Sequence, residues 1–588
     1  MLKRTVTCGE LRAQDDNKTV VLNGWVNKKR NLGGLTFIDL RDRYGITQIV
    51  FDPEVDRDLL KKSQGLGHED VIAVKGKVRT RPEDAQNPDR ETGEVELLAE
   101  EMEVLNTSET LPFMVTDRST ALEELRLEHR YLDLRTAELQ KTIETRFQAA
   151  KKTREYLNNL DFYEIETPFL IKSTPEGARD YVVPSRIQKG KFYALPQSPQ
   201  TYKQLLMISG YDRYYQIVKC FRDEDLRADR QPEFTQIDLE MSFVEESDIM
   251  DLTEKMLREI FAEVVDVKLP EKFPRMTYDQ AIRRYGSDKP DLRFGNQIET
   301  LNDIVIKSDF RVFTSVVEGG GTVAGICVPH ADQFSRKVID DLTAKTQDWG
   351  AKGLAYTKVG ENGLESGIAK FMKPISEELI DKFTAEPGDI LFFIADDTRK
   401  TYPILGHLRN ELANRLDLRE DGFKPVWITE FPLLEWEEDQ ERYIATHHPF
   451  TAVVSEDMDK LEKNPEEVQA RAYDIVINGY EIGGGSIRNH SVEDQKKMFK
   501  ALNISKEEYE KKFGFLLKAL SFGAPPHGGI ALGFDRLVML LAGVDNIRDV
   551  IAFPKTTSAS SMMTKCPDAI DPQQLKELGL KIIDTGKS

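Results

Sequence analysis

Residues 220–243 place charges of both signs beside an aromatic ring, a combination that can bind a flat, charged ligand. Phe234, Gln236 and Asp238 fall on one face of a predicted strand, and the residues between them fall on the other. The preceding stretch RYYQIVKCFRDE alternates in the same way, and the charged segment LRADRQPE separates the two. The pattern predicts an antiparallel hairpin with one polar, arginine-bearing face. A solvated edge hairpin whose charges pair with one another is the alternative.

Two further stretches carry residues that could hold a ligand or a metal ion. Asp474 and Glu481 read, from the local pattern alone, as two unrelated strand carboxylates. His447 and His448 are adjacent, but no cysteine or third histidine lies at ligand spacing, which disfavours a zinc site. The three glycines 483–485 let the backbone approach a ligand closely, or form only a turn.

The composition indicates a soluble, cytoplasmic protein without a membrane span or a signal peptide. The 588 residues include 40% hydrophobic and 31% charged side chains, and the four cysteines are scattered along the chain. A net charge of −20 argues against indiscriminate binding of nucleic acid. Residues 1–50, however, hold nine basic and five acidic side chains, a local balance of +4. A local basic site therefore remains possible in this region.

The N-terminal region reads as short β-runs separated by turns, which predicts a five-stranded barrel of the OB-fold type. Lys28, Lys29 and Arg30 precede Phe37 in this region, and a basic groove with an aromatic platform can hold unstacked bases. A position of Phe37 in the barrel core is the alternative. The predicted organisation is a barrel at 1–105, a linker at 106–135, a core at 136–290, an inserted domain at 291–415 and a second part of the core at 416–588.

Three stretches resemble, in chain order, the signature motifs of class II aminoacyl-tRNA synthetases. They are DFYEIETPFL, then FRDE with RQPEF, and GIALGFDR. Further stretches are similar to bacterial-type aspartyl-tRNA synthetases, in the aspartyl, asparaginyl and lysyl subgroup: TPEGARDY, ALPQSPQTYKQLL, HHPFT, GYEIGGGSIR and IRDVIAFPKT. The resemblance implies an α+β multidomain protein with an OB-fold barrel that reads the anticodon, an antiparallel-sheet catalytic core and an inserted α+β domain. It also implies a cytoplasmic homodimer, with Pro168 at the dimer interface.

The same resemblance assigns roles to individual residues. Arg222 would bridge the substrate α-carboxylate and the α-phosphate of ATP, and Arg536 would lie against the adenine as a second catalytic cation. Lys203 and Arg488 would bind the side-chain carboxylate of L-aspartate, Arg488 in a bidentate manner. The other residues that would bind the substrate L-aspartate are Glu176, Ser198, Gln200, Asp238 and His447. The other residues that would bind ATP are Glu224, Arg230, Gln231, Phe234, Glu481, Gly533, Phe534 and Asp535. Asp474 and Glu481 would hold Mg²⁺, and Arg30, Phe37 and Gln48 would contact the anticodon.

The activity that the resemblance implies has two steps. L-Aspartate and ATP would form aspartyl-adenylate and pyrophosphate, and aspartate would then pass to the 3′ end of tRNA(Asp). Charging of tRNA(Asn) as well is the nearest alternative, and asparaginyl or lysyl specificity is another. The pair Lys203 and Arg488 argues against asparaginyl or lysyl specificity, because an amide or ammonium side chain would leave two cations unpaired. Two alternatives belong to other functional classes. One is a binding protein that keeps the fold without the enzyme activity, and the other is an amide-forming ligase that uses no tRNA.

Overall fold

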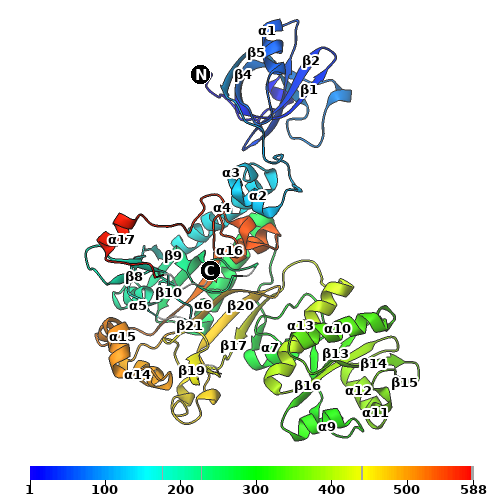
Figure 1. Cartoon of the computed structure of the whole chain (residues 1–588), viewed down its shortest axis with the longest axis vertical. Coiled ribbons are helices and arrows are strands. Elements are labelled where there is room, and N and C mark those ends of the chain that lie inside the picture. The colour runs from blue at the N-terminus through cyan, green and yellow to red at the C-terminus, as the bar shows by residue number, and fades with distance from the viewer. Residues whose placement is uncertain (175–176, 227, 439–440, 584–588) are drawn as a thin grey trace. The chain divides into compact units, whose positions relative to one another are not determined.

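The computed structural model describes residues 1–174, 177–226, 228–438 and 441–583 of the chain. They divide into two compact units, Met1–Glu144 with Ile551–Asp568, and Thr145–Val550 with Ala569–Ser588 (Figure 1). Within these described ranges, no helix has both the length and the apolar character needed to span a membrane.

A closed barrel forms the N-terminal part of the first unit, with strand order β1-β2-β3-β5-β4. Its strands are β1 (Thr19–Leu32), β2 (Leu35–Asp42), β3 (Gly45–Phe51), β4 (Val71–Thr80) and β5 (Val95–Asn106). Helix α1 (Arg57–Gln64) connects β3 to β4 and begins at Asp56, whose carboxylate accepts hydrogen bonds from two backbone N–H groups. Alternate apolar side chains of the strands, such as Leu22, Ile38 and Leu97, fill the interior. The small β-barrel predicted from the sequence is confirmed.

Buried arginines connect the segments that follow the barrel. Helices α2 (Glu123–Glu128) and α3 (Arg130–Asp133) are short, and the chain enters the second unit within α4 (Ala137–Asn158). Arg130 binds Asp133 at 2.6 Å and donates to the carbonyl oxygens of Ile551 and Ala552. Residues 551–568 therefore pack with the first unit although they lie near the C-terminus.

The second unit is built, in its described residues, on a sheet in the order β11-β17-β20-β21-β22-β10-β9-β6. The pairs within it are antiparallel except at the two edges, where β11 pairs with β17 and β6 with β9 in parallel. Its strands are β6 (Tyr163–Glu164), β9 (Arg213–Phe221), β10 (Glu233–Ser242), β11 (Arg275–Thr277), β17 (Pro425–Thr429), β20 (Ala472–Ile477), β21 (Tyr480–Ile487) and β22 (His527–Gly533). Strands β9 and β10 are the predicted hairpin, with Asp238 opposite Gln216.

A separate sheet of order β12-β13-β16-β14-β15 lies between two parts of this core in the sequence. Its strands are β12 (Ile298–Thr300), β13 (Thr322–Val328), β14 (Ala355–Gly360), β15 (Gly363–Glu365) and β16 (Ile390–Asp396). The helices of this region are α8 (Asn302–Val305), α9 (Arg311–Glu318), α10 (Arg336–Asp348), α11 (Ala369–Met372), α12 (Ser376–Phe383) and α13 (Thr398–Leu416). Two apolar clusters, one with Phe392 and one with Phe393, form its core. Neighbouring residues of β16 thus serve different clusters, as strand alternation requires.

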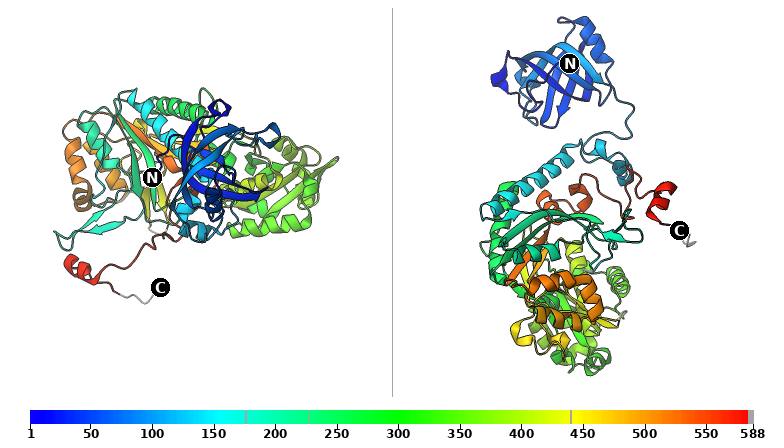
Figure 2. Two further views of the ribbon diagram at one scale, coloured as in Figure 1. Left: turned by 90° about the horizontal axis from the view of Figure 1, so that it is seen from above. Right: turned by 90° about the vertical axis from the view of Figure 1, so that its left-hand side faces the viewer.

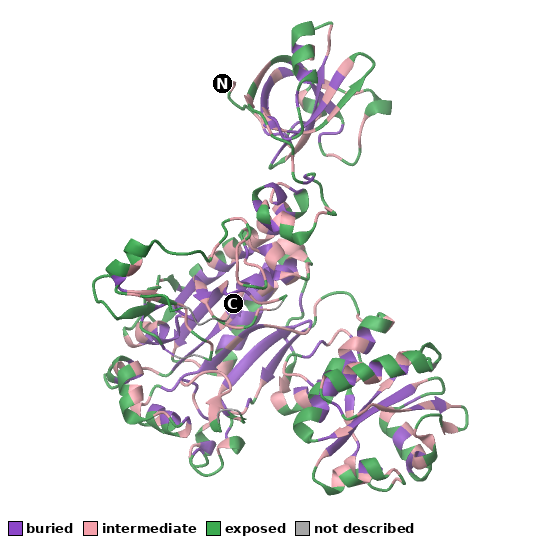
Figure 3. Ribbon diagram, viewed as in Figure 1, coloured by how far each residue is buried: buried purple, intermediate pink, exposed green. Residues whose placement is uncertain are grey.

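Helices pack against the large sheet and position the residues around it. Helix α16 (Phe534–Ala542) contacts β10 and β21, and α6 (Glu246–Val265) contacts β22. Figure 2 shows the ribbon of the chain from two further sides. The remaining helices of the unit are α5 (Gln200–Ile208), α7 (Tyr278–Tyr285), α14 (Val492–Ala501), α15 (Lys506–Leu520) and α17 (Pro572–Leu578). Two small hairpins complete the described elements, β7 (Val182–Pro184) with β8 (Phe192–Ala194) and β18 (Leu434–Glu437) with β19 (Arg442–Ala445). The strands of both sheets are largely buried, whereas many helices expose one side (Figure 3).

Candidate active site

A cavity of about 510 Å³ lies against the large sheet and collects most of the residues predicted to bind substrates. That volume suits a small organic ligand. The predicted residues that line it are Ser198, Gln200, Lys203, Arg222, Glu224, Arg230, Gln231, Phe234, Asp238, His447, Asp474, Glu481, Arg488, Gly533, Asp535 and Arg536. They come from α5, β10, β20, β21, β22, the start of α16 and the connecting loops. Segments far apart in the sequence therefore meet at one site.

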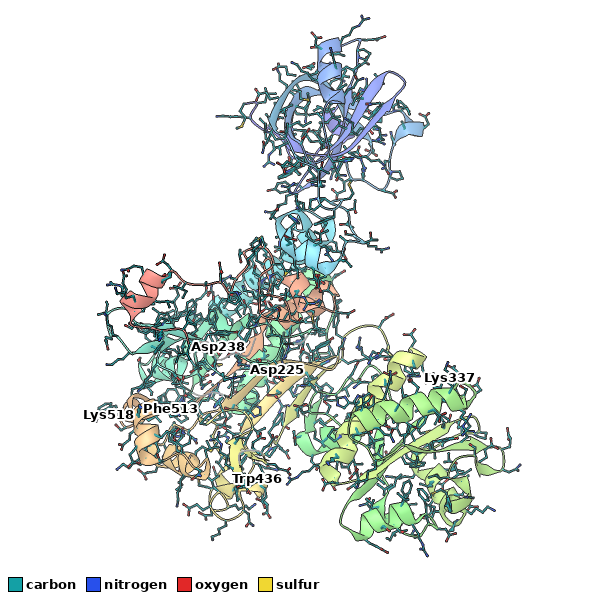
Figure 4. The ribbon with its side chains drawn as sticks, in the orientation of Figure 1. Asp225, Asp238, Lys337, Trp436, Phe513 and Lys518 are labelled. Atoms are coloured by element: carbon teal, nitrogen blue, oxygen red, sulfur yellow. The ribbon has the colours of Figure 1, made fainter. Side chains whose placement is uncertain are left out.

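Two buried ion pairs lie in this cavity's wall and beneath it. The Lys203 ammonium lies 2.7 Å from Asp238 Oδ1 and 3.4 Å from Glu240 Oε2. Arg488 donates from Nε and Nη2 to the two oxygens of Glu240, at 2.9 and 3.1 Å. Lys203 and Arg488 are each 2% exposed, and both carboxylates are fully buried. Asp238 lies on β10 in the middle of the unit (Figure 4), and its Oδ2 is buried without a hydrogen-bond partner among the described residues.

The environment shifts the pKa values of the two carboxylates in opposite directions. Burial raises the pKa of Asp238 above its usual value, although Lys203 opposes this effect. Burial also acts to raise the pKa of Glu240, but Arg488 and Lys203 outweigh it and the pKa is lowered. Glu240 is therefore the ionised partner of the arginine, while Asp238 keeps one oxygen available.

Glycines make room for two of these carboxylates. A Cβ on Gly529, which pairs with Glu240 across β22 and β10, would lie 2.1 Å from Glu240 Oε2. A Cβ on Gly484, opposite Asp474 in the β20–β21 pair, would lie 2.6 Å from Asp474 Oδ1. Both distances are far below van der Waals contact, so a side chain at either glycine would displace the carboxylate. The glycine-rich strands are thus shaped around acidic side chains of neighbouring strands.

A second group of cations lies toward the β9–β10 hairpin. The Arg222 guanidinium lies over the Phe234 ring, 5.0 Å from its centroid, and forms no ion pair with any described residue. Arg230 and Glu224 are 3.5 Å apart. Arg536 contacts Asp229 Oδ2 at 3.1 Å and donates to the Glu481 carbonyl oxygen at 3.0 Å. A cation without a neutralising partner in the described residues favours an anionic ligand at Arg222.

Phe534 and Asp535 have structural contacts that the sequence did not reveal. Phe534 is 2% exposed, does not line the cavity, and packs under the Arg146 guanidinium at 4.8 Å. Asp535 accepts hydrogen bonds from Arg146 Nη1 at 2.5 Å and from the Thr235 backbone N–H at 2.7 Å. Asp535 therefore holds the first turn of α16 against β10, and Phe534 packs that turn against Arg146 of α4, with Arg536 beside them.

Asp474 and Glu481 form the acidic side of the cavity. His447 Nε2 lies 3.0 Å from Asp474 Oδ1, and the imidazole meets the Phe431 ring edge-on at 4.7 Å between centroids. Burial acts to lower the pKa of His447, but the Asp474 carboxylate outweighs it and the pKa is raised. Within the described ranges, no set of three or more His, Cys, Asp or Glu side chains gathers as a metal site. Two carboxylates fit an ion that takes its other ligands from water and phosphate, as Mg²⁺ does.

The sequence analysis assigned no role to several residues that shape this site. Glu240 holds Arg488, and His448 Nε2 lies 2.5 Å from Arg488 Nη1. Asp229 holds Arg536, and Asp288 lines the cavity from the loop after α7. The alternation of β10 was a signal for Glu240, because it lies two residues beyond Asp238 on the same face. The adjacent histidines drew attention to His448, and the charged segment LRADRQPE contains Asp229, but no local pattern pointed to Asp288.

The predicted anticodon residues share one face of the barrel. Arg30 pairs with Phe37 across β1 and β2, and Asp39 pairs with Gln48 across β2 and β3. Arg30 Nη2 donates to Asp39 Oδ1 and to Gln48 Oε1, both at 2.9 Å. The Phe37 ring is half-buried, whereas Gln48 is buried and donates to Glu96 Oε2 at 2.7 Å. Arg30 and Phe37 are thus accessible, and Gln48 lies beneath them with both ends of its amide engaged.

Pro168 does not line the cavity. Pro168 follows the edge strand β6 and is exposed beside Phe169 and Leu170, which are 44% and 53% exposed. Glu176 lies outside the described residues. The sheet edge near β6 therefore carries an exposed apolar surface.

Comparison with known proteins identifies the family. Residues 122–557 match the family "tRNA synthetases class II (D, K and N)", and residues 20–105 match "OB-fold nucleic acid binding domain". The chain is 54% identical to an aspartate–tRNA(Asp/Asn) ligase of Desulfatibacillum aliphaticivorans, over 99% of this chain and 98% of that one. It is 52% identical to an aspartate–tRNA ligase of Macrococcus caseolyticus, over 99% of each chain.

A solved structure shares the fold at low sequence identity. The asparaginyl-tRNA synthetase of Pyrococcus horikoshii, in complex with asparaginyl-adenylate, superposes with a TM-score of 0.59 and 20% identity. The superposition covers 95% of this chain and 99% of that one. The predicted OB-fold barrel, antiparallel-sheet core and family resemblance are confirmed. The chain belongs to the class II tRNA synthetases of the D, K and N type, and within them to the aspartate–tRNA ligases.

Proposed function

We propose that the protein activates L-aspartate with ATP and transfers it to the 3′ end of tRNA(Asp). The observation that carries this proposal is the cavity in which Lys203 and Arg488 lie near Asp238, whose buried Oδ2 has no hydrogen-bond partner in the described part of the chain. Cations in the wall suit the side-chain carboxylate of aspartate, and the free oxygen suits its ammonium group. The family membership and the names of the relatives support the same substrate.

In this proposal, the substrate side chain meets the cations from the cavity side. Glu240 occupies the Nε–Nη2 edge of Arg488, and Nη1 lies within hydrogen-bond distance of Ser486 Oγ and His448 Nε2. A carboxylate that binds in a bidentate manner at the Nη1–Nη2 edge would therefore take the remaining Nη2 donor and displace one of the two Nη1 contacts. Lys203 would contribute a further donor. Ser198, Gln200 and Asp238 would hold the ammonium group, and His447 and Glu176 would cover the bound amino acid. Asp238 and Glu240 already pair these cations, so an asparagine side chain would leave only the cavity-facing donors of Arg488 and Lys203 without an anionic partner, which disfavours it.

Arg222 would bring the two reacting anions together. An oxygen of the substrate α-carboxylate attacks the α-phosphorus of ATP, a new C–O–P linkage forms, and the bond to the pyrophosphate oxygen breaks. Arg222 would contact both groups, since it lines the cavity and no described residue forms an ion pair with it. Phe234 and Arg536 would lie on the two faces of adenine. Glu224, Gln231 and Arg230 would contact the base and phosphates, and Gly533 would allow close approach of the backbone.

Asp474 and Glu481 would hold Mg²⁺ in this proposal. When bound, the ion would offset the negative charge of the phosphates. His447 would keep the Asp474 carboxylate oriented through its hydrogen bond. In the second step, the terminal ribose hydroxyl of tRNA attacks the aspartyl carbonyl carbon and AMP leaves. Arg30 and Phe37 would contact the anticodon, with Gln48 supporting Arg30 from beneath.

The choice of tRNA has a second candidate. Several relatives carry the name aspartate–tRNA(Asp/Asn) ligase, whereas others carry the name aspartate–tRNA ligase. We favour tRNA(Asp) as the main substrate and regard tRNA(Asn) as the alternative. We further propose that the protein is a cytoplasmic homodimer, formed around Pro168 and the exposed apolar edge near β6. We also propose that the chain has the five-part domain organisation predicted from its sequence.

The deciding experiment is amino-acid-dependent exchange of pyrophosphate into ATP, measured for each of the twenty amino acids. Exchange with L-aspartate alone supports the proposal, and exchange with asparagine or lysine instead would contradict it. Charging of tRNA(Asp) and tRNA(Asn) transcripts on the same preparation decides between the two tRNA candidates. Omitting Mg²⁺ should abolish exchange if the two carboxylates act as proposed.

A further inference from the structure

A chain of buried hydrogen bonds runs from the cavity wall into the protein interior. Gln200 Nε2 donates to Gln204 Oε1 at 3.2 Å, and Gln204 Nε2 lies 3.2 Å from His527 Nε2. His527 Nδ1 lies 2.8 Å from the Pro525 carbonyl oxygen. Gln200 and Gln204 are one turn apart on α5, and His527 begins β22. Gln200 is 4% exposed, and the other two side chains are fully buried.

The donor and the acceptor of each hydrogen bond in this series can be assigned by starting at its buried end, the Pro525 carbonyl oxygen. A carbonyl oxygen can only accept, so His527 Nδ1 must carry the proton that it donates to Pro525. Burial lowers the pKa of His527 and, together with Arg488 and His490, outweighs the opposing effect of Glu240. The lowered pKa favours the neutral imidazole, in which a protonated Nδ1 leaves Nε2 as the acceptor. Gln204 must then donate to it.

The same argument extends outward to Gln200. Because the Gln204 amide nitrogen points to His527, its amide oxygen points to Gln200 and must receive a hydrogen bond. Gln200 therefore directs its own nitrogen inward, which leaves its amide oxygen as the outer atom. Within the described residues this oxygen accepts no hydrogen bond, and Gln200 lines the cavity. The wall consequently presents an acceptor there and not a donor.

We propose that Gln204 and His527 are positioning residues, which fix the Gln200 amide with its oxygen toward the cavity as an acceptor for the ammonium group of the substrate. This inference rests on the proposed function, because it takes the substrate of the cavity to be an α-amino acid. Without the chain, the Gln200 amide could rotate and present its NH₂ group to a cation. Together with the partnerless Oδ2 of Asp238, the fixed oxygen makes the subsite selective for a donor.

The test compares L-aspartate with succinate, which has both carboxylates but no ammonium group. Gln204→Met keeps the side-chain volume and removes both hydrogen bonds. We expect KM for L-aspartate in pyrophosphate exchange to rise about tenfold, the effect of one lost hydrogen bond to a charged group. KM for ATP and the inhibition constant of succinate should stay unchanged. An equal weakening of succinate, or an unchanged KM for aspartate, would overturn the proposal.

Two further comparisons keep the test decisive if Gln204→Met is unstable. His527→Gln retains an acceptor for Gln204 and should stay near wild type, whereas His527→Met removes it and should reproduce the loss for aspartate. In a Gln200→Met background, Gln204→Met should have no additional effect on KM. An additional tenfold loss there would contradict a chain that acts through Gln200.

The same assays separate this inference from the proposed function. If the wild-type protein activates a different amino acid, the proposed substrate is wrong. The role of Gln204 and His527 is then tested with that amino acid and with its analogue that lacks the amino group. If the wild type activates aspartate and the variants weaken aspartate and succinate alike, only the positioning role is wrong.

Discussion

Replacement of Arg488 by lysine is the sharpest test of how the substrate side chain is bound. The guanidinium makes four contacts in the structure. Its Nε and Nη2 donate to Glu240 at 2.9 and 3.1 Å, and its Nη1 lies 2.7 Å from Ser486 Oγ and 2.5 Å from His448 Nε2. A lysine ammonium is a single point and cannot span Glu240 on one side and Ser486 on the other.

The expected magnitude follows from this geometry. Lysine keeps the positive charge and can retain contact with either Glu240 or Ser486, but not with both. The bidentate contact to the substrate is therefore the interaction that is lost. One hydrogen bond between charged groups contributes about 1.5–3 kcal/mol. KM for L-aspartate should therefore rise roughly tenfold to a hundredfold. The free energy of unfolding should fall as well, because Glu240 loses one of its two buried donors.

The assay is aspartate-dependent pyrophosphate exchange, with urea denaturation of the same preparation. Arg471→Lys is a matched control, because Arg471 also binds two glutamates, Glu245 and Glu246, yet does not line the cavity. It should lower stability without changing KM for aspartate. Unchanged KM and kcat in Arg488→Lys would refute the assignment of Arg488 to the substrate carboxylate.

Three other predictions concern chemistry, tRNA recognition and pH. Arg222→Ala should abolish pyrophosphate exchange while leaving tRNA binding nearly intact, and exchange within tenfold of wild type would contradict its bridging role. Phe37→Ala should preserve exchange but weaken tRNA(Asp) binding by about 1–3 kcal/mol, measured as lost aminoacylation efficiency, whereas full charging would show that the ring contacts no base. Burial acts to raise the pKa of Glu240, but Arg488 and Lys203 lower it, so the unfolded chain binds its proton at higher pH than the folded one. The stability difference between wild type and Glu240→Gln should thus be largest above the ordinary pKa of 4.5 and shrink as pH falls below it, and a difference independent of pH would contradict this ion pairing.

The sequence predicted the parts of the fold that depend on local pattern. Strict alternation identified β9 and β10, and the strands paired as a hairpin with Asp238 opposite Gln216. The barrel followed from short β-runs between turns. The resemblance to class II aminoacyl-tRNA synthetases, and not the local pattern, assigned most of the residues that line the cavity.

The contacts that pair these residues with one another could not be predicted in this way. Glu240 binds Arg488, which lies 248 residues later, and fits there because Gly529 on a third strand leaves space for the carboxylate. Gln48, predicted to read a base, accepts a hydrogen bond from Arg30 and donates one to Glu96, and its local sequence indicated neither partner. Such pairings depend on strand order and on the residues opposite, neither of which a local pattern contains.

The paired charges also explain how a chain with a net charge of −20 can hold an anionic substrate. Two unpaired cations in a buried wall would be strongly destabilising, and Asp238 and Glu240 remove that penalty before any ligand arrives. The wall is then neutral overall, with two positive and two negative groups. Aspartate adds one ammonium and two carboxylates, so its side chain and ammonium group can pair with the wall while its α-carboxylate remains for Arg222. Asparagine would bring the same α-groups but no side-chain charge, which leaves the Arg488 edge without an anion. Discrimination between the two therefore resides in the side-chain subsite, and Arg488→Lys should reduce it more than any change at Arg222.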